Sequence, residues 1–353
     1  MVKLLDCTLR DGGYVNNWNF TNEQVTECYK ACSEGGIEYM EIGFRNRKSA
    51  SAIQKYGATY FCTDEFVNKI VADVPNGSKV AVMVTINEFD FADFVPASES
   101  NIKLVRVLMA YHGGKNGDDE VLDLKQLNEG ILQINKLTDL GYEVAFNIGR
   151  IDKVSFSQLY EVCKLVSSTR IKYFVMADTY GSVELDYIET LIPFVKNTFS
   201  ELESNIEVGF HAHDNCANAT SKALYSLKFG ASIIDGCMLG FGRGSGNAKT
   251  ELLTMNLNKH KNRNYNIVPL LSYGDIYISS YKECKHHVSY NLVYAIAAYI
   301  GCHISYAIDI IEKYDKLDIV DVYNAFLHIK AQNKHMFYND KLFNNTIVDM
   351  TSK

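Results

Sequence analysis

Short runs of apolar residues alternate along most of the chain with longer segments whose apolar residues recur at helical spacing. The short runs are rich in Val, Ile, Phe and Tyr, and this alternation predicts repeated strand-helix units. Eight runs are expected to be strands: VKLLDCT at 2–8, YMEIGF at 39–44, KVAVMV at 79–84, LVRVLMA at 104–110, EVAFNI at 143–148, YFVMAD at 173–178, EVGFHAH at 207–213 and IIDGCML at 233–239.

Segments compatible with helices lie between these strands. Several of them end at a glycine, as at Gly35, Gly141 and Gly230, which suits a left-handed residue after a helix. The clearest such segments are 22–34, 122–140, 155–167, 184–199 and 218–229.

Eight strand-helix units in about 255 residues have the size and rhythm of a (β/α)₈ TIM barrel, an α/β fold. We therefore expect a TIM-barrel domain over residues 1–260. The alternative is an open doubly wound sheet, whose first strand is typically followed by G-x-G-x-x-G. Here the first predicted strand ends in R-D-G-G at 10–13, which disfavours that alternative.

The pattern changes after Lys259. A link rich in Lys, Asn and Arg, NKHKNRN at 258–264, leads into a segment whose apolar residues again recur at helical spacing. This predicts a C-terminal helical domain over 265–353, so that the whole fold is a TIM barrel with a C-terminal helical extension.

Composition narrows the class of protein. With 353 residues, 47% of them hydrophobic and 22% charged, the chain is expected to be globular. The net charge of −7 disfavours nucleic acid and anionic membranes as partners. We see no secretory signal and no run of about 18 apolar residues, so we expect a cytoplasmic protein without a membrane partner.

Nine cysteines are scattered along the chain without a C-x-x-C pair, which favours reduced thiols over a disulfide framework or a zinc site. Cys28 and Cys32 share one face of a predicted helix. Because free cysteine usually behaves as a small apolar residue, we expect this pair to be buried thiols.

Two histidines lie at the end of the seventh predicted strand, in His211-Ala212-His213-Asp214. Because side chains alternate along a strand, His211 and His213 point to the same side. Active sites of TIM barrels form at the carboxyl ends of the strands, where this pair lies. Neutral imidazole is the commonest metal ligand, so a metal site is favoured over two core histidines bonded to their neighbours.

Arg10 and Asp11 lie at the end of the first predicted strand, before two glycines. Taken alone, they are also compatible with a purely structural ion pair, which is the less favoured alternative. In a closed barrel, however, the first strand lies beside the eighth and close to the seventh, which brings Asp11 near His211 and His213. One carboxylate and two imidazoles make a facial set of metal ligands with positions left open for water or substrate.

A glycine-rich segment, GFGRGSGN at 240–247, follows the eighth predicted strand. Backbone N–H groups of loops at this place in a TIM barrel often hold phosphate. The segment lacks the Lys-Ser/Thr ending of a P-loop, and a flexible loop is an equally good interpretation of its composition.

Three motifs together carry a resemblance to a known family: LLDCTLRDGG at 4–13, HAHDN at 211–215 and GFGRGSGNAKTELL at 240–253. Roughly the first 260 residues resemble the DRE-TIM metallolyases, or HMG-CoA lyase-like enzymes, and within them the pyruvate-dependent class II aldolases of the 4-hydroxy-2-oxovalerate aldolase type. The resemblance implies that Asp11, His211 and His213 bind a divalent ion, Mn²⁺ or Mg²⁺, with Asn247 as a fourth ligand.

The resemblance also implies roles for residues around the ion. Arg10 would stabilise the enolate oxygen, and Glu41 would hold the site residues in place without itself binding the ion or the substrate. Thr179 would hold the substrate carboxylate, and Asn247 would contact the substrate as well as the ion. Tyr290, at the start of the helical segment after the barrel, would reach into the active site.

The implied activity is that of an aldehyde-lyase, a metal-dependent pyruvate aldolase. It cleaves or forms a 4-hydroxy-2-oxo acid from pyruvate and an aldehyde through a metal-bound pyruvate enolate. The lyase branch with a catalytic cysteine in the glycine-rich loop is disfavoured, because 240–247 contains no cysteine. Two alternatives remain: a Claisen-type enzyme that condenses an acyl-CoA with a 2-oxo acid, as isopropylmalate synthase does, and a non-catalytic metal-binding barrel.

One position departs from these aldolases. Where they carry a histidine as general base, three residues after the metal-binding Asp, this chain has Tyr14. A tyrosine with a pKa of about 10 is a poor base at neutral pH unless that pKa is lowered. Either Tyr14 is adapted to the task, or His112, His287 or His303 takes the proton, or the acceptor substrate differs.

The expected partners are small molecules, a 2-oxo acid and an aldehyde. In related aldolases the helical tail contacts an aldehyde dehydrogenase that receives the product. A homodimer interface is the other ordinary use of such a tail, and the sequence alone does not choose between them.

Overall fold

Eight parallel strands close into a barrel in the order β1-β2-β3-β4-β5-β6-β7-β8, with β1 paired to β8. The computed structural model describes residues 2–109, 123–261, 263–278, 281, 292–314, 317 and 319–351. The closed barrel confirms the predicted TIM-barrel fold and excludes the open sheet. The strands are β1 Lys3–Asp6, β2 Tyr39–Phe44, β3 Lys79–Thr85, β4 Ile102–Met109, β5 Glu143–Ile148, β6 Tyr173–Asp178, β7 Glu207–Ala212 and β8 Ile233–Gly236.

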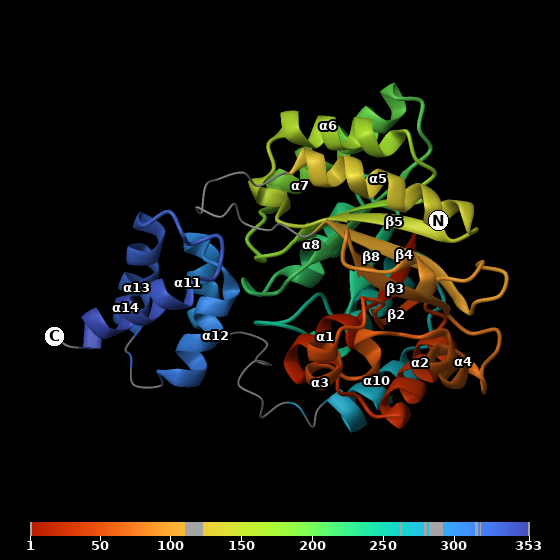
Figure 1. Cartoon of the computed structure of the whole chain (residues 1–353), viewed down its shortest axis with the longest axis horizontal. Coiled ribbons are helices and arrows are strands. Elements are labelled where there is room, and N and C mark those ends of the chain that lie inside the picture. Colours follow the sequence, from red (N-terminus) through yellow and green to blue (C-terminus); the bar gives the residue numbers. More distant parts are fainter. Residues whose placement is uncertain are drawn as a thin grey trace.

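Helices surround the barrel as an outer layer (Figure 1). Those along the barrel are α1 Thr8–Asn16, α2 Asn22–Gly35, α3 Ala50–Lys55, α4 Asp64–Val71, α5 Leu124–Asp139, α6 Phe156–Ser167, α7 Leu185–Glu201, α8 Ala219–Ser226, α9 Thr250–Lys261 and α10 Ile267–Tyr273. Short helical turns are η1 Ala58–Tyr60, η2 Phe91–Asp93, η3 Ile151–Lys153, η4 Met238–Gly240 and the π-turn η5 Gly274–Ile278. The C-terminal helices are α11 Leu292–Ile300, α12 Ile304–Lys313, α13 Ile319–Ala331 and α14 Asp340–Thr351.

Local sequence signals set several helix boundaries. Thr21 and Gln24 form a capping box at the start of α2, where each side chain accepts a backbone N–H of the other residue. The chain leaves α2 through Gly36, whose φ of 76° is left-handed, rather than through Gly35, which is the last helical residue. Gly141 and Gly230 have positive φ, as predicted.

Two apolar cores hold the barrel together. Inside it, side chains such as Leu5, Tyr39 and Tyr173 pack across the axis. A larger core lies between the strands and the surrounding helices and explains why the strand sequences are apolar on both faces. The barrel is therefore filled by side chains and is not an open channel.

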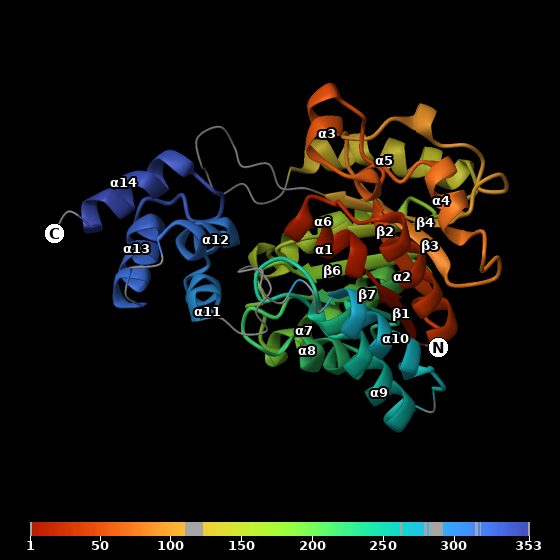
Figure 2. The same ribbon diagram turned by 90° about the horizontal axis from the view of Figure 1, so that it is seen from below.

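The helices α11–α14 bury an apolar core of their own, which includes Tyr294, Ile310, Phe326 and Phe343. Both views show these helices grouped on one side of the barrel (Figures 1 and 2). The division into domains at 260 and 265 stays a prediction. None of the helices in the described parts of the chain is long and apolar enough to cross a membrane.

The segments between the C-terminal helices contact the barrel beside the carboxyl ends of its strands. The Tyr180 hydroxyl, after β6, donates to the carbonyl of Met336 at 3.1 Å. The Arg150 guanidinium, after β5, lies 4.2 Å from the centre of the Phe337 ring. The segment between α11 and α12 brings His303 to the same end of the barrel.

One prediction about the first strand is wrong. β1 ends at Asp6, and Arg10 and Asp11 lie in helix α1 rather than at the end of a strand. Gly12 allows this helix to approach the glycine-rich loop, because a Cβ at Gly12 would lie only 2.1 Å from the Phe241 ring. The helix turns Arg10 and Asp11 over the carboxyl end of the barrel.

Candidate active site

A cavity of about 230 Å³ opens at the carboxyl ends of the strands. That volume is below the roughly 300–1,000 Å³ of pockets for drug-sized ligands, so the cavity suits a small substrate. Its lining includes predicted site residues from α1, β7 and the loop after β6: Arg10, Asp11, Tyr14, Thr179, His211 and His213.

Asp11, His211 and His213 offer three candidate metal-ligating atoms that all lie within 4.8 Å of one another. Oδ1 of Asp11 and Oδ1 of Asn247 are buried and have no hydrogen-bond partner among the described residues. Two orphaned oxygens beside two imidazoles fit a divalent cation, because buried polar atoms without partners are costly. The structure thus brings all four predicted ligands to one end of the barrel.

Asn247 reaches this place because the glycine-rich loop pairs with the end of β7. His213 and Asn247 form an isolated antiparallel bridge, and the N–H of Asp214 donates to the carbonyl of Gly246 at 2.8 Å. A Cβ at Gly242 would lie 2.1 Å from Nδ2 of Asn247 and 3.2 Å from Oδ1 of Asp11. Glycine at 242 therefore keeps space free beside the two oxygens.

Six buried side chains form a closed ring of ion pairs and hydrogen bonds, the buried ring. In order around it, they are Arg10, Asp11, His211, Asp235, Arg106 and Glu41. The N–O distances between successive members are 2.8, 3.4, 3.0, 2.5, 3.1 and 2.6 Å, the last from Glu41 back to Arg10. The ring fixes the orientation of two predicted metal ligands and of Arg10.

The ring also determines the protonation of the imidazole of His211. Its Nδ1 lies 3.0 Å from Oδ2 of Asp235, and its Nε2 lies 3.4 Å from Oδ2 of Asp11. Burial opposes the charged form, but hydrogen bonds with Asp11 and Asp235 raise the pKa of His211 well above its ordinary value, so a cation that binds Nε2 has to displace a proton.

The pKa directions of Asp11 and His213 suit a bound cation, whereas the raised pKa of His211 means that this ligand has to lose a proton first. Burial opposes ionisation of Asp11, but the charge of Arg10 and the hydrogen bond with His211 hold the pKa of Asp11 well below its ordinary value. Burial lowers the pKa of His213 to about 3, so its imidazole is neutral at neutral pH. An ionised carboxylate and a neutral imidazole are the forms that bind metal.

The other predicted residues fall in several places. Glu41 is a member of the buried ring. Oγ1 of Thr179 accepts the backbone N–H of Arg150 at 2.8 Å and lines the cavity. Tyr14 lies on α1 near the cavity mouth, under the guanidinium of Arg243. Tyr290, His112 and His287 lie outside the described residues. The roles assigned to all of these stay predictions.

Sequence reasoning missed Arg106 and Asp235. Each is a charged residue inside an apolar strand segment, LVRVLMA and IIDGCML. A charged residue is rarely buried unless it is paired, so a charge inside an apolar strand segment indicates a buried ion pair. Both side chains are 1% exposed in the structure. Asn147 and Arg243, which also line the cavity, had no comparable signal.

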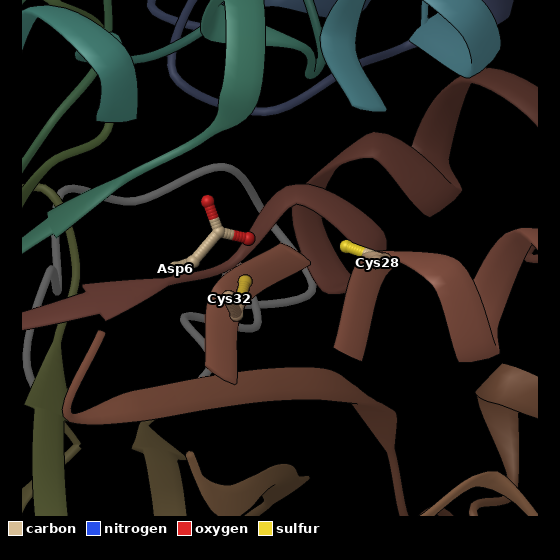
Figure 3. A group of neighbouring side chains, drawn as sticks. All are labelled: Asp6, Cys28 and Cys32. Carbon is tan, nitrogen blue, oxygen red and sulfur yellow. The ribbon is translucent and has the colours of Figure 1, made fainter. Parts of the chain in front are cut away.

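A second cluster, Asp6 on β1 with Cys28 and Cys32 on α2, lies outside the cavity (Figure 3). The Asp6 carboxylate already accepts hydrogen bonds from Thr8 and Thr250. Burial raises the pKa of both thiols, which favours the protonated form. The two thiols therefore pack as buried neutral side chains, in line with the expectation for the two cysteines.

The opposite end of the barrel carries a larger hollow of about 540 Å³. Its charged side chains include Lys79 and Glu143, which pair with each other at 2.9 Å. No candidate metal-ligating group among the described residues lies in its lining. Size alone does not make it the active site, because the chemistry-bearing groups gather at the other end.

Fold, cavity and donor set together define a TIM-barrel enzyme with a candidate divalent-metal centre. The chain belongs to the HMGL-like family, whose model matches residues 1–276. Enzymes of this family depend on divalent metal ions. The predictions of an enzyme and of a divalent cation are therefore confirmed, and the choice between Mn²⁺ and Mg²⁺ stays a prediction.

Curated relatives carry the name 4-hydroxy-2-oxovalerate aldolase. One from Pelotomaculum thermopropionicum is 28% identical over 252 residues, which cover 71% of this chain and 68% of the relative. One from Moorella thermoacetica is 27% identical over 252 residues, covering 71% and 69%. These relatives, together with the family, confirm the predicted aldolase-like function.

Solved structures share the fold. The N-terminal domain of a candidate aldolase from Bacteroides vulgatus superposes with a TM-score of 0.71 at 23% identity and covers 88% of this chain and 97% of that one. HMG-CoA lyase from Bacillus subtilis gives a TM-score of 0.62 at 18% identity, covering 81% and 95%. At these identities the likeness supports the fold alone.

Proposed function

We propose that this chain is a divalent-metal-dependent aldolase that cleaves a 4-hydroxy-2-oxo acid into pyruvate and an aldehyde, or forms the acid from them. The observation that carries the proposal is the set of Asp11, His211 and His213 beside Arg10 in a small cavity. The names of the curated relatives support the same reaction.

Asp11, His211, His213 and Asn247 would hold the ion, which we propose to be Mn²⁺ or Mg²⁺, since carboxylate and amide oxygens suit these ions. When bound, the ion supplies a Lewis acid that polarises the 2-oxo group. The buried ring keeps Asp11 ionised and holds Nε2 of His211 beside it, so binding of the ion would release the proton that Nε2 carries.

Arg10 is placed to stabilise negative charge on the enolate oxygen of pyruvate. Its Nε donates to Glu41 at 2.6 Å and its Nη1 to Asp11 at 2.8 Å. These bonds fix the guanidinium plane and leave Nη2 for a ligand in the cavity that Arg10 lines. A hydrogen-bond donor that is already oriented stabilises negative charge more strongly where water is excluded.

Thr179 is suited to the carboxylate of the 2-oxo acid. Its oxygen accepts the N–H of Arg150, so its own hydroxyl hydrogen is left to donate into the cavity. Such a donor orients the substrate so that its 2-oxo oxygen faces Arg10.

The proton of the 4-hydroxyl needs an acceptor during cleavage. His303 lines the cavity, but its Nδ1 accepts the N–H of Ser305 at 3.3 Å, which leaves the ring hydrogen on Nε2. Burial lowers the pKa of His303 to about 3, so this ring is a donor rather than a base. His112 and His287 stay candidate bases.

Tyr14 is a weak candidate for the base. Although part of this residue is exposed, exclusion of water raises its pKa, against the opposing charges of Arg243 and Arg10. The phenol therefore stays protonated at neutral pH. We expect Tyr14→Phe to lower kcat for cleavage of 4-hydroxy-2-oxovalerate by less than about 10-fold, measured as released pyruvate.

A loss above about 100-fold in Tyr14→Phe, together with disappearance of a proton-dependent limb from the pH profile of kcat, would instead identify Tyr14 as the base. The phenylalanine keeps the ring under Arg243, so the comparison isolates the hydroxyl.

Exchange of the pyruvate methyl protons in D₂O tests the proposed function directly. We expect the purified chain to exchange them with Mn²⁺ or Mg²⁺ and to lose this activity in EDTA, as followed by mass spectrometry of pyruvate. Exchange requires only enolate formation, so no aldehyde need be known. A chain that binds the ion but never exchanges the protons would contradict the proposal.

The small-molecule partners of this proposal are a 2-oxo acid and an aldehyde. Homodimer formation, an aldehyde dehydrogenase partner and a cytoplasmic location stay predictions. The acyl-CoA condensing alternative gains no support, because the curated relatives described above are aldolases.

A further inference from the structure

Arg243 differs from three buried arginines at this end of the barrel. Arg10, Arg106 and Arg45 each pair with a carboxylate. Arg243 is half-buried and lines the cavity, yet none of the carboxylates in the described ranges lies within ion-pair distance of it. A cation brought out of water without a counter-charge is costly, which favours an anion supplied by a ligand.

The ring of Tyr14 holds Arg243 in position. The guanidinium carbon lies 5.1 Å from the ring centre. A guanidinium stacked on an aromatic face keeps its N–H groups at the edge of the plane, where a carboxylate or phosphate binds with two parallel hydrogen bonds. Tyr14 stands at the position where this chain departs from the histidine of the aldolases it resembles.

Arg243 lies toward the mouth of the cavity rather than at its metal-binding end. Tyr14, on which it stacks, is 41% exposed, whereas Asp11 is 1% exposed. Arg10, Thr179 and the ion are sufficient for the pyruvate part of the substrate. The acceptor aldehyde enters from the mouth and has to lie between pyruvate and solvent, so Arg243 faces the acceptor.

A second polar group in the cavity has no partner. Asn147, at the end of β5, is 3% exposed, and its Oδ1 has no hydrogen bond among the described residues. An unsatisfied buried amide oxygen is costly, and a hydroxyl group of a ligand that donates to it would offset this cost. The cavity is thus built for a polar acceptor, since Asn147 lines it together with Arg243.

We propose that Arg243, held on the ring of Tyr14, binds an anionic group on the acceptor aldehyde, a carboxylate or a phosphate. The chain would then act on 4-hydroxy-2-oxo acids that carry a second negative group at the end remote from the pyruvate carboxylate. This inference rests on the proposed aldolase function and names its substrate class.

The test compares aldehydes that differ only in the anionic group. Succinic semialdehyde and butanal have the same chain length with and without a carboxylate. Glyceraldehyde 3-phosphate and glyceraldehyde differ by a phosphate. We expect kcat/KM for condensation with pyruvate to be about 10- to 100-fold higher for the charged member of one pair, in line with a charge-assisted hydrogen bond, and the preferred pair distinguishes carboxylate from phosphate.

Arg243→Met should bring the ratio of the two kcat/KM values in the preferred pair to within about 3-fold, and Arg243→Lys should keep part of it. Because the ratio is measured within one variant, any general loss of activity cancels. Arg170→Met is the matched control, since Arg170 is an exposed arginine that pairs with Asp139 outside the cavity. It should leave the ratio as in the wild type.

The proposal is overturned if neither pair favours the charged aldehyde, or if the ratio survives in Arg243→Met. Failure of the aldolase function looks different, because exchange of the pyruvate methyl protons would then be absent in the wild type. Exchange with no preference for charged aldehydes therefore removes this inference and leaves the proposed function standing.

Discussion

Asp11→Asn is expected to reduce exchange of the pyruvate methyl protons by at least about 10³-fold. The substitution removes the single carboxylate of the proposed metal set. It also places an amide next to the Nη1 of Arg10, which now donates to Oδ2 of Asp11 at 2.8 Å. Both effects act in a buried site, where water does not compensate for the lost charge.

Metal binding provides the second measurement for Asp11→Asn. Calorimetric titration with Mn²⁺ should show clear binding to the wild type and at least about 100-fold weaker binding to the variant. Asp139→Asn serves as the control, because Asp139 is an exposed carboxylate that pairs with Arg170. An Asp11→Asn variant that keeps more than a tenth of the exchange rate would show that Asp11 is not a ligand.

Arg106→Met is expected to reduce the free energy of unfolding by about 3–5 kcal/mol. Arg106 is 1% exposed and joins Glu41 and Asp235 across the interior of the barrel. Without it, two buried carboxylates face each other with no cation between them on that side of the ring. Urea unfolding followed by circular dichroism gives the difference in stability directly.

The matched control is Arg170→Met, which breaks an ion pair whose two side chains are each 66% exposed and should not change stability measurably. A stability loss below about 1 kcal/mol in Arg106→Met would mean that the carboxylates are neutralised or hydrated without the guanidinium. The stability of the barrel would then not depend on the buried ring.

The strands were predictable because their residues carry the signal locally. The runs at 39–44, 143–148 and 173–178 form β2, β5 and β6 with the predicted bounds. Strands in a parallel barrel are buried on both faces, so their apolar runs are continuous and their ends are marked by polar residues.

The first site motif was recognised but misplaced. Arg10 and Asp11 were expected at a strand end and lie in helix α1. Periodicity over so few residues does not separate a strand end from a helix start, and Gly12 and Gly13 argue against a helix by propensity. Gly12 and Gly13 lie so close to Phe241 and Trp18 that a Cβ at either position would clash, and the sequence does not reveal these two contacts.

The links between site residues could not be read from the sequence. His211 and Asp235 lie on adjacent strands, while Arg106 and Asp235 lie on β4 and β8, which do not pair directly. Their contact depends on closure of the barrel and on the length of the arginine side chain. The same holds for Arg243, whose neighbour Tyr14 lies more than 200 positions away.

The buried ring draws its members from opposite sides of the barrel, from β2, β4, β7, β8 and the helix after β1. A cation that recognises Asp11 and His211 in this arrangement binds only the closed barrel, and not a partly assembled one. Binding to the native state alone shifts the folding equilibrium by mass action. The supply of the metal would thus raise the fraction of molecules that are folded, in addition to supporting activity.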